Sequence, residues 1–208
     1  MSMIPRICLS ILAVSSITLS ACNSTRGGSS GPKDGKFSMP PSPGEDWHKV
    51  GQEDGSLSYI RVADPSDDDV ITLFASSEMV ESKIGSYEEL AQYIRNKGIQ
   101  GLLREDLEVT TFRGVPGVRY EIFTRDVGTG GSPETRAKLG LMERQPGTEY
   151  YVRTEVFAFM DPSDSTRIVN LGISRMSFHG KIGDAYGNIR NIFVSDFLSQ
   201  NNIPGFNG

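Results

Sequence analysis

Apolar and polar side chains alternate along most of the chain beyond Trp47, with the two-residue period of strands that bury one face of a sheet. Turn-forming pairs such as Asp54-Gly55 and Asp161-Pro162 separate the runs. The alternation predicts strands at residues 57–63, 70–76, 107–113, 118–126, 149–160 and 167–176. Residues 135–144 fit a strand slightly better than a helix that would begin near Pro133. We therefore expect seven or eight strands, most of them joined by hairpins.

Two stretches change to the 3.6-residue period of an amphipathic helix. The first begins after Ser86, which is placed to cap the helix while Glu89, three residues later, completes a capping box, and it ends near Gly98. The second runs from Asp184, a good cap, to Leu198. The apolar faces hold Tyr87, Leu90, Ala91 and Ile94 in the first helix and Ile189, Ile192, Phe193 and Phe197 in the second.

These elements predict an α+β fold, in which a single antiparallel sheet of about seven strands has two amphipathic helices packed on it. The globular domain should span residues 46–199, followed by a frayed tail at 200–208. The sequence DPSD occurs at Asp64 and again at Asp161, each time between two predicted strands. This repetition allows an old ββα duplication, but one turn chemistry used twice explains it more simply.

The first 21 residues have the pattern of an export signal. Arg6 is their only charged side chain, and residues 7–19 form an apolar run of thirteen, which is too short to stay in a bilayer as a spanning helix. Small side chains at Ser20 and Ala21 suit cleavage. Residues 1–21 are therefore predicted to be a signal peptide.

Leu19, Ser20, Ala21 and Cys22 resemble the lipobox of bacterial lipoproteins at all four positions. The resemblance implies a diacylglycerol thioether on Cys22, cleavage before it, and acylation of the new amino group with a chain such as palmitate. Two or more acyl chains anchor a protein stably. Asn23 stands where an aspartate marks inner-membrane retention in enteric bacteria, so the resemblance favours the outer membrane, with the protein facing the periplasm.

Residues 22–45 are rich in glycine, serine and proline and are predicted to form a disordered tether. Its reach by the flexible-coil rule is roughly 25 Å. The sequence analysis assigns no packing role to the isolated apolar residues Phe37 and Met39.

The composition excludes some classes of binding partner. The formal net charge is −5 and no block of lysine or arginine is present, which argues against nucleic acid and against electrostatic docking on a membrane. Cys8 and Cys22 are the only cysteines, so the predicted domain contains no disulfide or thiolate ligand. We expect no cofactor and no metal.

Four candidate sites each have a simpler structural interpretation. His48 and His179 are 131 positions apart and lack the closely spaced ligands of a zinc site. The cluster Asp64, Asp67, Asp68 and Asp69 supplies oxygens that calcium prefers, yet its spacing departs from the EF-hand and a solvated turn is favoured. The glycine-rich residues 128–131 lack the lysine of a phosphate loop. The aromatics Tyr150, Tyr151, Phe157 and Phe159 are expected on both faces of one strand.

The order of hairpins and helices over residues 46–199, with the phrase RGVPGVRY at 113–120, resembles the PsbP/Mog1-like fold of several small envelope lipoproteins. That resemblance implies a mostly non-enzymatic family that acts by binding other proteins, and it carries over no site residue. We therefore expect a lipid-anchored, non-catalytic binding or assembly module of the bacterial envelope. The alternative is a tethered hydrolase or small-ligand-binding protein whose site is built from scattered residues.

Overall fold

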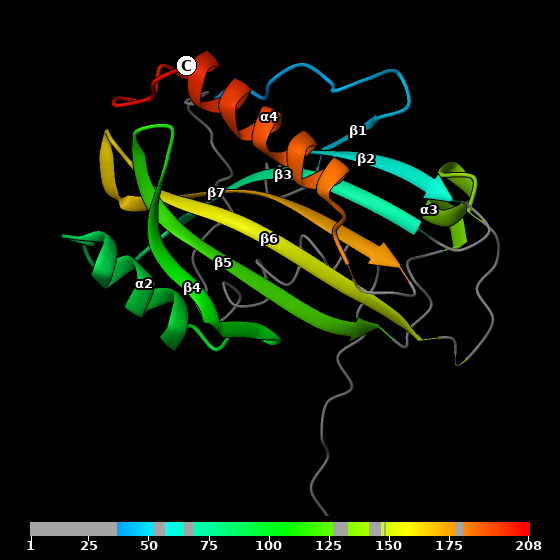
Figure 1. The fold of residues 1–208 in the computed structure, drawn as a ribbon, viewed down its shortest axis with the longest axis horizontal. Coiled ribbons are helices and arrows are strands. Elements are labelled where there is room, and N and C mark those ends of the chain that lie inside the picture. Colours follow the sequence, from blue (N-terminus) through cyan, green and yellow to red (C-terminus); the bar gives the residue numbers. More distant parts are fainter. Residues whose placement is uncertain are drawn as a thin grey trace, which may run out of the picture.

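The computed structural model describes residues 37–51, 57–64, 69–126, 133–141, 147, 149–177 and 181–208. This part of the chain forms one antiparallel sheet of seven strands and three helices, as Figure 1 shows. The elements are β1 (His48–Gly51), β2 (Leu57–Asp64), β3 (Asp69–Met79), α2 (Tyr87–Asn96), β4 (Leu102–Phe112), β5 (Val115–Asp126), α3 (Pro133–Lys138), β6 (Tyr150–Asp161), β7 (Asp164–Ser177) and α4 (Asp184–Gln200). The prediction of an α+β fold with a single antiparallel sheet of about seven strands is confirmed.

The strand order is β1-β2-β3-β7-β6-β5-β4. β3 and β7 pair at the centre from Val70↔Met176 to Met79↔Arg167, so the N-terminal and C-terminal halves meet there. β1 and β4 form the two edges of the sheet. The site described below lies on the half made by β4, β5 and β6.

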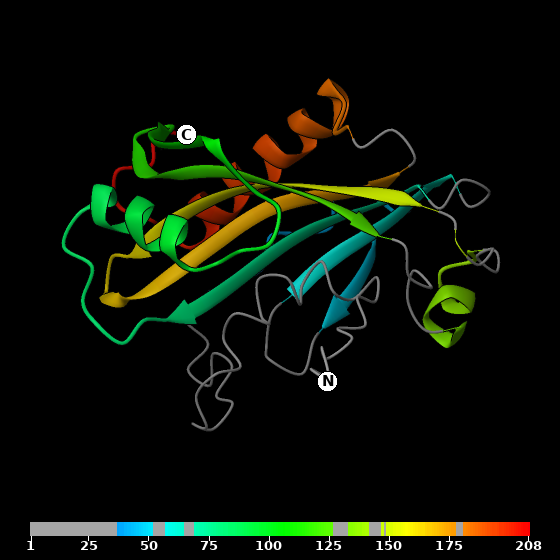
Figure 2. The same ribbon diagram turned by 90° about the horizontal axis from the view of Figure 1, so that it is seen from below.

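The two longer helices cover opposite faces of this sheet. Phe193 and Phe197 of α4 pack on one face with Leu73 and Phe157. Leu90 of α2 packs on the other face, in a cluster that includes Val156. Figure 2 shows α4 above the sheet and α2 below the green β4–β5 ribbon. A twofold relation between β2-β3-α2 and β6-β7-α4 would have its axis normal to the sheet and would place both helices on one face, so the topology argues against the duplication.

The predicted Ser86 cap of the first helix is confirmed, although the return bond of Glu89 goes to Gly85 and not to Ser86, and the predicted cap of the last helix is wrong. The Ser86 hydroxyl accepts a hydrogen bond from the Glu89 N–H at 3.1 Å, and the Glu89 carboxylate accepts one from the Gly85 N–H at 2.7 Å. α4 has Gly183 as its N-cap, without a side-chain hydrogen bond, and Asp184 is its first residue. Ile192, assigned to the buried face of this helix, is 60% exposed.

The preference for a strand at residues 135–144 is wrong, because α3 occupies Pro133–Lys138. A proline suits the first turn of a helix, where its missing N–H would have had no partner. The chain leaves α3 through Gly140 at φ 69°, and Leu141 then packs into a cluster with Ile60 and Met176. The apparent alternation near Leu141 comes from this re-entry into the core.

The C-terminal segment is folded against the domain, so the frayed tail predicted for residues 200–208 is wrong. Gln200 ends α4, and Ile203 is only 7% exposed. The Asn207 N–H donates a hydrogen bond of 2.8 Å to the carbonyl of Arg113, in the β4–β5 turn. Phe206 packs against the core on the α4 face, which explains why this short segment stays in place.

The predicted tether boundary is also wrong. Residues 37–40, named here the N-terminal strap, lie on the folded domain. Phe37 and Met39 pack against the core beside α4, and the Tyr59 hydroxyl donates a hydrogen bond of 2.7 Å to the carbonyl of Pro40. The rest of the predicted tether, residues 22–36, lies outside the described residues.

Within the described part of the chain, no helix has the length and apolar character needed to cross a bilayer.

Candidate functional site

Several residues singled out from sequence fall outside the described part of the structure: Cys22, Asp67, Asp68, His179 and residues 128–131. His48 is exposed on β1. Of the four aromatics on β6, Tyr150, Phe157 and Phe159 are buried, and they lie on both faces of the sheet. The described candidates are therefore not brought together into one site.

Of the acidic cluster, Asp64 and Asp69 are described, and Asp69 forms an ion pair with an arginine. The Arg175 guanidinium donates to both carboxylate oxygens of Asp69, one of them at 2.8 Å from Nε. This hydrogen bond, more than any other contact, raises the pKa of Arg175. The described residues contain no group of three or more histidine, cysteine or acidic side chains placed to hold a metal ion.

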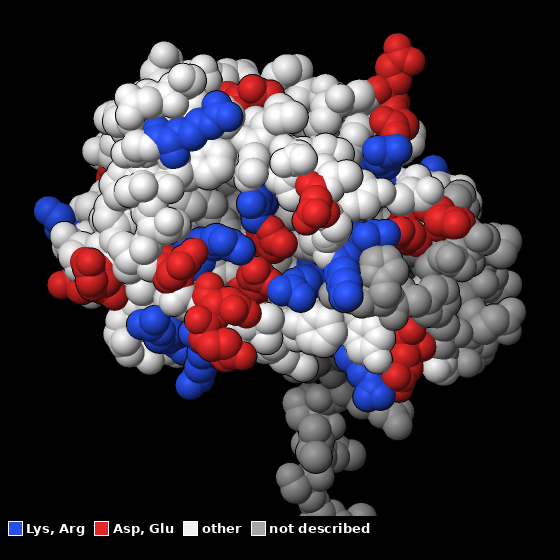
Figure 3. Space-filling view, in the orientation of Figure 1, with Lys and Arg blue, Asp and Glu red and all other residues white. Residues whose placement is uncertain are grey.

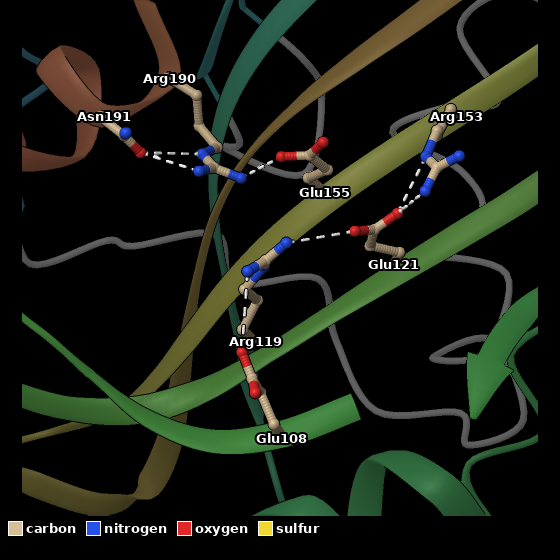
Figure 4. Close-up of polar contacts among 7 residues, drawn as sticks. All are labelled: Glu108, Arg119, Glu121, Arg153, Glu155, Arg190 and Asn191. Atoms are coloured by element: carbon tan, nitrogen blue, oxygen red, sulfur yellow. Dashed lines mark hydrogen bonds and ion pairs between the residues drawn. The ribbon is translucent and has the colours of Figure 1, made fainter. Parts of the chain in front are cut away.

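A band of alternating acidic and basic side chains lies below α4 on the face shown in Figure 3. Its centre is a set named here the charged groove, which the strands β4, β5 and β6 and the helix α4 build together. Its members, drawn in Figure 4, are Glu108, Arg119, Glu121, Arg153, Glu155, Arg190 and Asn191. Sequence reasoning did not identify any of them.

The strand register places like charges opposite each other, which explains why each of them has a partner of opposite charge. Glu121 of β5 lies directly opposite Glu155 of β6, and Arg153 lies opposite Arg175 of β7. Like charges directly across a sheet destabilise it. Each member of these pairs is therefore bonded to an opposite charge.

Glu121 is the central acid of the groove and is almost fully buried. Arg153 Nε donates to its Oε2 at 2.9 Å, and Arg119 Nη2 donates to its Oε1 at 3.3 Å. Arg119 also reaches Glu108 on the edge strand, with a nitrogen–oxygen separation of 3.7 Å. The chain of four charges thus crosses from β6 to β4 (Figure 4).

The negative charge of Glu155 is balanced by a side chain of helix α4. Phe193 and Val194 fix α4 on the sheet, and Arg190, one turn before them, reaches down to form an ion pair with Glu155. Asn191 holds the same guanidinium, accepting from Nη2 at 2.8 Å and from Nε at 3.2 Å. The position of α4 and the charge balance of β6 therefore depend on each other.

Two hollows lie along this helix. One of about 260 Å³ is bordered by Glu108, Thr110, Arg119, Arg190 and Val194, among others. A second of about 350 Å³ lies at the start of α4, between Glu155 and Gly183. Arg190 and Asn191 line both hollows, so the two are adjacent.

The surface beyond the groove carries an aromatic pair. The rings of Phe123 and Tyr151 stack at 5.5 Å between centroids, with planes 9° apart, and Phe123 is 36% exposed. Arg125, on the same strand as Phe123, binds Glu149 through two hydrogen bonds of 2.9 and 2.7 Å. Aromatic and arginine side chains beside each other are typical of surfaces that bind proteins.

The groove is polar, and its charges are balanced. Three carboxylates and three guanidiniums balance to zero, and every carboxylate has a guanidinium partner. None of its described lining residues is a histidine or cysteine. One sequence signal could have indicated part of it. Arg119 and Glu121, and likewise Arg153 and Glu155, stand two positions apart in strands and so share a face.

Comparison with known proteins gives no family. No family model matches the chain, and no curated protein matches it. Among solved structures, the chain is similar to LpqN of Mycobacterium tuberculosis, whose structure is described as that of a protein involved in cell envelope biogenesis. The TM-score is 0.36 at 12% sequence identity, over 77% of this chain and 79% of that one. A similarity at this level establishes neither a shared fold nor a shared function.

Proposed function

We propose that this protein is a lipid-anchored, non-catalytic binding or assembly module of the bacterial envelope. In this proposal Cys22 carries the lipid, the domain stands in the periplasm at the outer membrane, and the charged groove docks an envelope protein. The observation that carries the docking role is the state of the groove carboxylates. Each lies within ion-pair distance of a guanidinium, so the groove presents a row of alternating charges in fixed positions.

The paired charges of the groove add little to the stability of the fold, which supports a role in recognition. Burying Glu121 and placing it opposite Glu155 is unfavourable on its own, and paired buried charges contribute little net stability. A row of alternating charges does, however, orient a complementary surface and disfavour others. Phe123, exposed and stacked on the half-buried Tyr151, adds apolar area beside it.

The test is chemical crosslinking in intact cells, followed by mass spectrometry of the neighbours. Arg119→Glu places a negative charge between Glu108 and Glu121, whereas Arg125→Glu makes the same change on the same strand beyond the groove and serves as control. We expect an envelope protein that is recovered with the wild type and with Arg125→Glu and lost with Arg119→Glu, while both variants remain folded. Recovery of the same neighbours with the wild type and with Arg119→Glu would contradict the docking role.

The alternative is a tethered hydrolase or small-ligand-binding protein. The larger hollow, of about 350 Å³, favours it, because small-molecule pockets begin at about 300 Å³. A small-molecule screen by thermal shift separates the two proposals. A ligand that stabilises the wild type and loses its effect in Arg190→Ala supports the alternative.

A further inference from the structure

The two edges of the sheet differ in how they are protected from pairing with another chain. β1 is only four residues long and contains Lys49, and both features discourage strand addition. β4 is 11 residues long, and no strand lies beyond it in the described part of the chain. An unpaired edge presents N–H and C=O groups to any extended segment that reaches it.

Only the first half of β4 is protected. The register shifts between Leu103 and Glu108, so residues 104–107 bulge out of the ladder, and Arg104, Glu105 and Asp106 are exposed there. Charges and bulges are common protections of an edge. Residues 108–112, EVTTF, have neither lysine nor proline and contain three β-branched side chains, and Val109 is 44% exposed.

The register also identifies which backbone groups this edge presents. Arg113 and Gly114 have φ of 46° and 86° and form a two-residue turn between Phe112 and Val115. The pair that flanks such a turn is hydrogen-bonded, and bonded and non-bonded pairs then alternate. Val109 and Thr111 therefore direct their N–H and C=O groups away from β5.

The smaller hollow lies beside this edge. Glu108, Thr110 and Phe112 contribute its β4 side, and Arg119 and Arg190 contribute two guanidiniums. Of the charged side chains that line the hollow, two are positive and one is negative, and Glu121 and Glu155, the acidic partners of the two arginines, are not part of its lining. Arg119 is 46% exposed and lies 3.3 Å from Glu121 and 3.7 Å from Glu108, both beyond the 2.7–2.9 Å typical of a charge-assisted hydrogen bond, so its guanidinium can donate to a further carboxylate.

We propose that an extended segment of a partner protein adds to β4 along residues 108–112 as an eighth strand, and that an acidic side chain of this segment enters the hollow between Arg119 and Arg190. The new strand would lie two strand spacings, about 10 Å, from β5. An acidic side chain of the new strand and an arginine side chain of β5 can together span this distance. Pairing over five residues buries far less than the roughly 1,200 Å² of a stable interface, so this mode fits a transient contact with a partner protein better than a stable dimer of this chain. This inference rests on the proposed function and names its binding mode.

The test uses eight-residue peptides of alternating valine and threonine, with glutamate, glutamine or lysine at the fourth position. Fluorescence anisotropy measures their binding to the mature chain. We expect the glutamate peptide to bind at least about tenfold more tightly than the lysine peptide, and Arg119→Gln to remove this preference. Arg125→Gln, an exposed arginine of the same strand outside the hollow, should retain it. Equal binding of the three peptides, or no binding at millimolar concentration, overturns the proposal.

Thr111→Pro tests the strand addition itself, because proline removes an N–H that faces the free edge and leaves the bonds to β5. Thr111→Val keeps that N–H and serves as control. Binding should be lost in the first and retained in the second, and hydrogen exchange at the Val109 and Thr111 amides should slow when peptide is added. Equal binding by both variants overturns the proposal. A dimer held through β4 would show as peptide-independent protection and also overturns it.

The outcome is distinguishable from failure of the proposed function. If the soluble domain replaces the anchored protein in cells, the proposed function fails whatever the peptides do. If the anchor is required and Thr111→Pro, shown to be folded, works as well as the wild type, the proposed function stands and strand addition at β4 is wrong.

Discussion

The ring of Phe37 lies 5.7 Å, between centroids, from the ring of Phe197 on α4. The contact joins the start of the described chain to its last helix. Ser38 adds a reciprocal pair of hydrogen bonds with the Asn201 side chain, of 2.7 and 2.9 Å. Residues 37–40 of the predicted tether therefore belong to the folded domain, and residues 22–36 lie outside the described residues.

Loss of the strap contact should destabilise the domain. Phe37→Ala is expected to lower the free energy of unfolding by about 1–2 kcal/mol, less than for a fully buried phenylalanine because Phe37 is only partly buried. Urea denaturation measures the change. Ile192→Ala, which also truncates an apolar side chain but at a position 60% exposed on α4, should change it by less than about 0.5 kcal/mol. Equal effects of the two substitutions would show that the strap does not contribute to stability.

Gly172 on β7 should not tolerate a side chain. A Cβ there would lie 2.5 Å from the Glu155 carbonyl oxygen and 2.6 Å from Cζ of Phe74, whose ring covers this position. Gly172→Ala is expected to cost about 1–3 kcal/mol of stability. Gly187→Ala in α4 meets no atom within 4 Å and should be neutral or stabilising by up to about 1 kcal/mol. Thermal unfolding of the two variants tests this, and similar melting temperatures would contradict it.

Alkaline pH should weaken the fold through Tyr120. Burial raises the pKa of this phenol well above its usual range, and the charges of Glu78 and Tyr93 raise it further. The unfolded chain releases the proton near pH 10 while the folded chain keeps it, so the free energy of unfolding falls as pH rises above about 10. The full contribution is present below that pH.

Tyr120→Phe should therefore flatten this decline, by at most about 1.4 kcal/mol per pH unit. Part of the decline should remain, because burial also raises the pKa of Tyr59 and of Tyr87. Urea denaturation between pH 8 and pH 11 measures the slope. An identical slope in the wild type and in Tyr120→Phe excludes this tyrosine as a cause.

Cys22 should carry the lipid. Metabolic labelling with palmitate is expected to label the wild type and to be absent in Cys22→Ser, since the thioether needs the thiol. Cys8→Ser, which changes the other cysteine of the chain, should leave labelling unchanged. Labelling that persists in Cys22→Ser would disprove the anchor.

Local rules predicted the elements whose signals lie close together in the chain. Ser86 and Glu89 are three residues apart, and their cap is present as expected. Period-two alternation located β6 and β7 within a few residues of their ends. The cap of α4 failed by one residue, at Gly183, whereas the failures at both ends of the domain involve partners that are distant in sequence. Nothing near Phe37 indicates that α4 will receive it 160 positions later.

The same distinction applies to the charged groove. Arg119 and Glu121 share a face by their spacing, and this much could be predicted from the sequence. That Glu155 lies opposite Glu121 depends on the register of β5 with β6, and that Arg190 completes the balance depends on which face α4 covers. Neither is encoded locally, so the site becomes visible only in the folded chain.

The dependence of function on the anchor tests the central claim most directly. A binding module presented at a membrane gains effective concentration from its anchor, whereas an enzyme on a diffusible substrate does not. The measurement is growth under envelope stress of a deletion strain that produces, at native levels, either the lipidated protein or a secreted, correctly folded form without the lipid site. We predict rescue by the lipidated protein alone. Full rescue by the secreted form would contradict the assembly role and favour the tethered enzyme or ligand-binding protein.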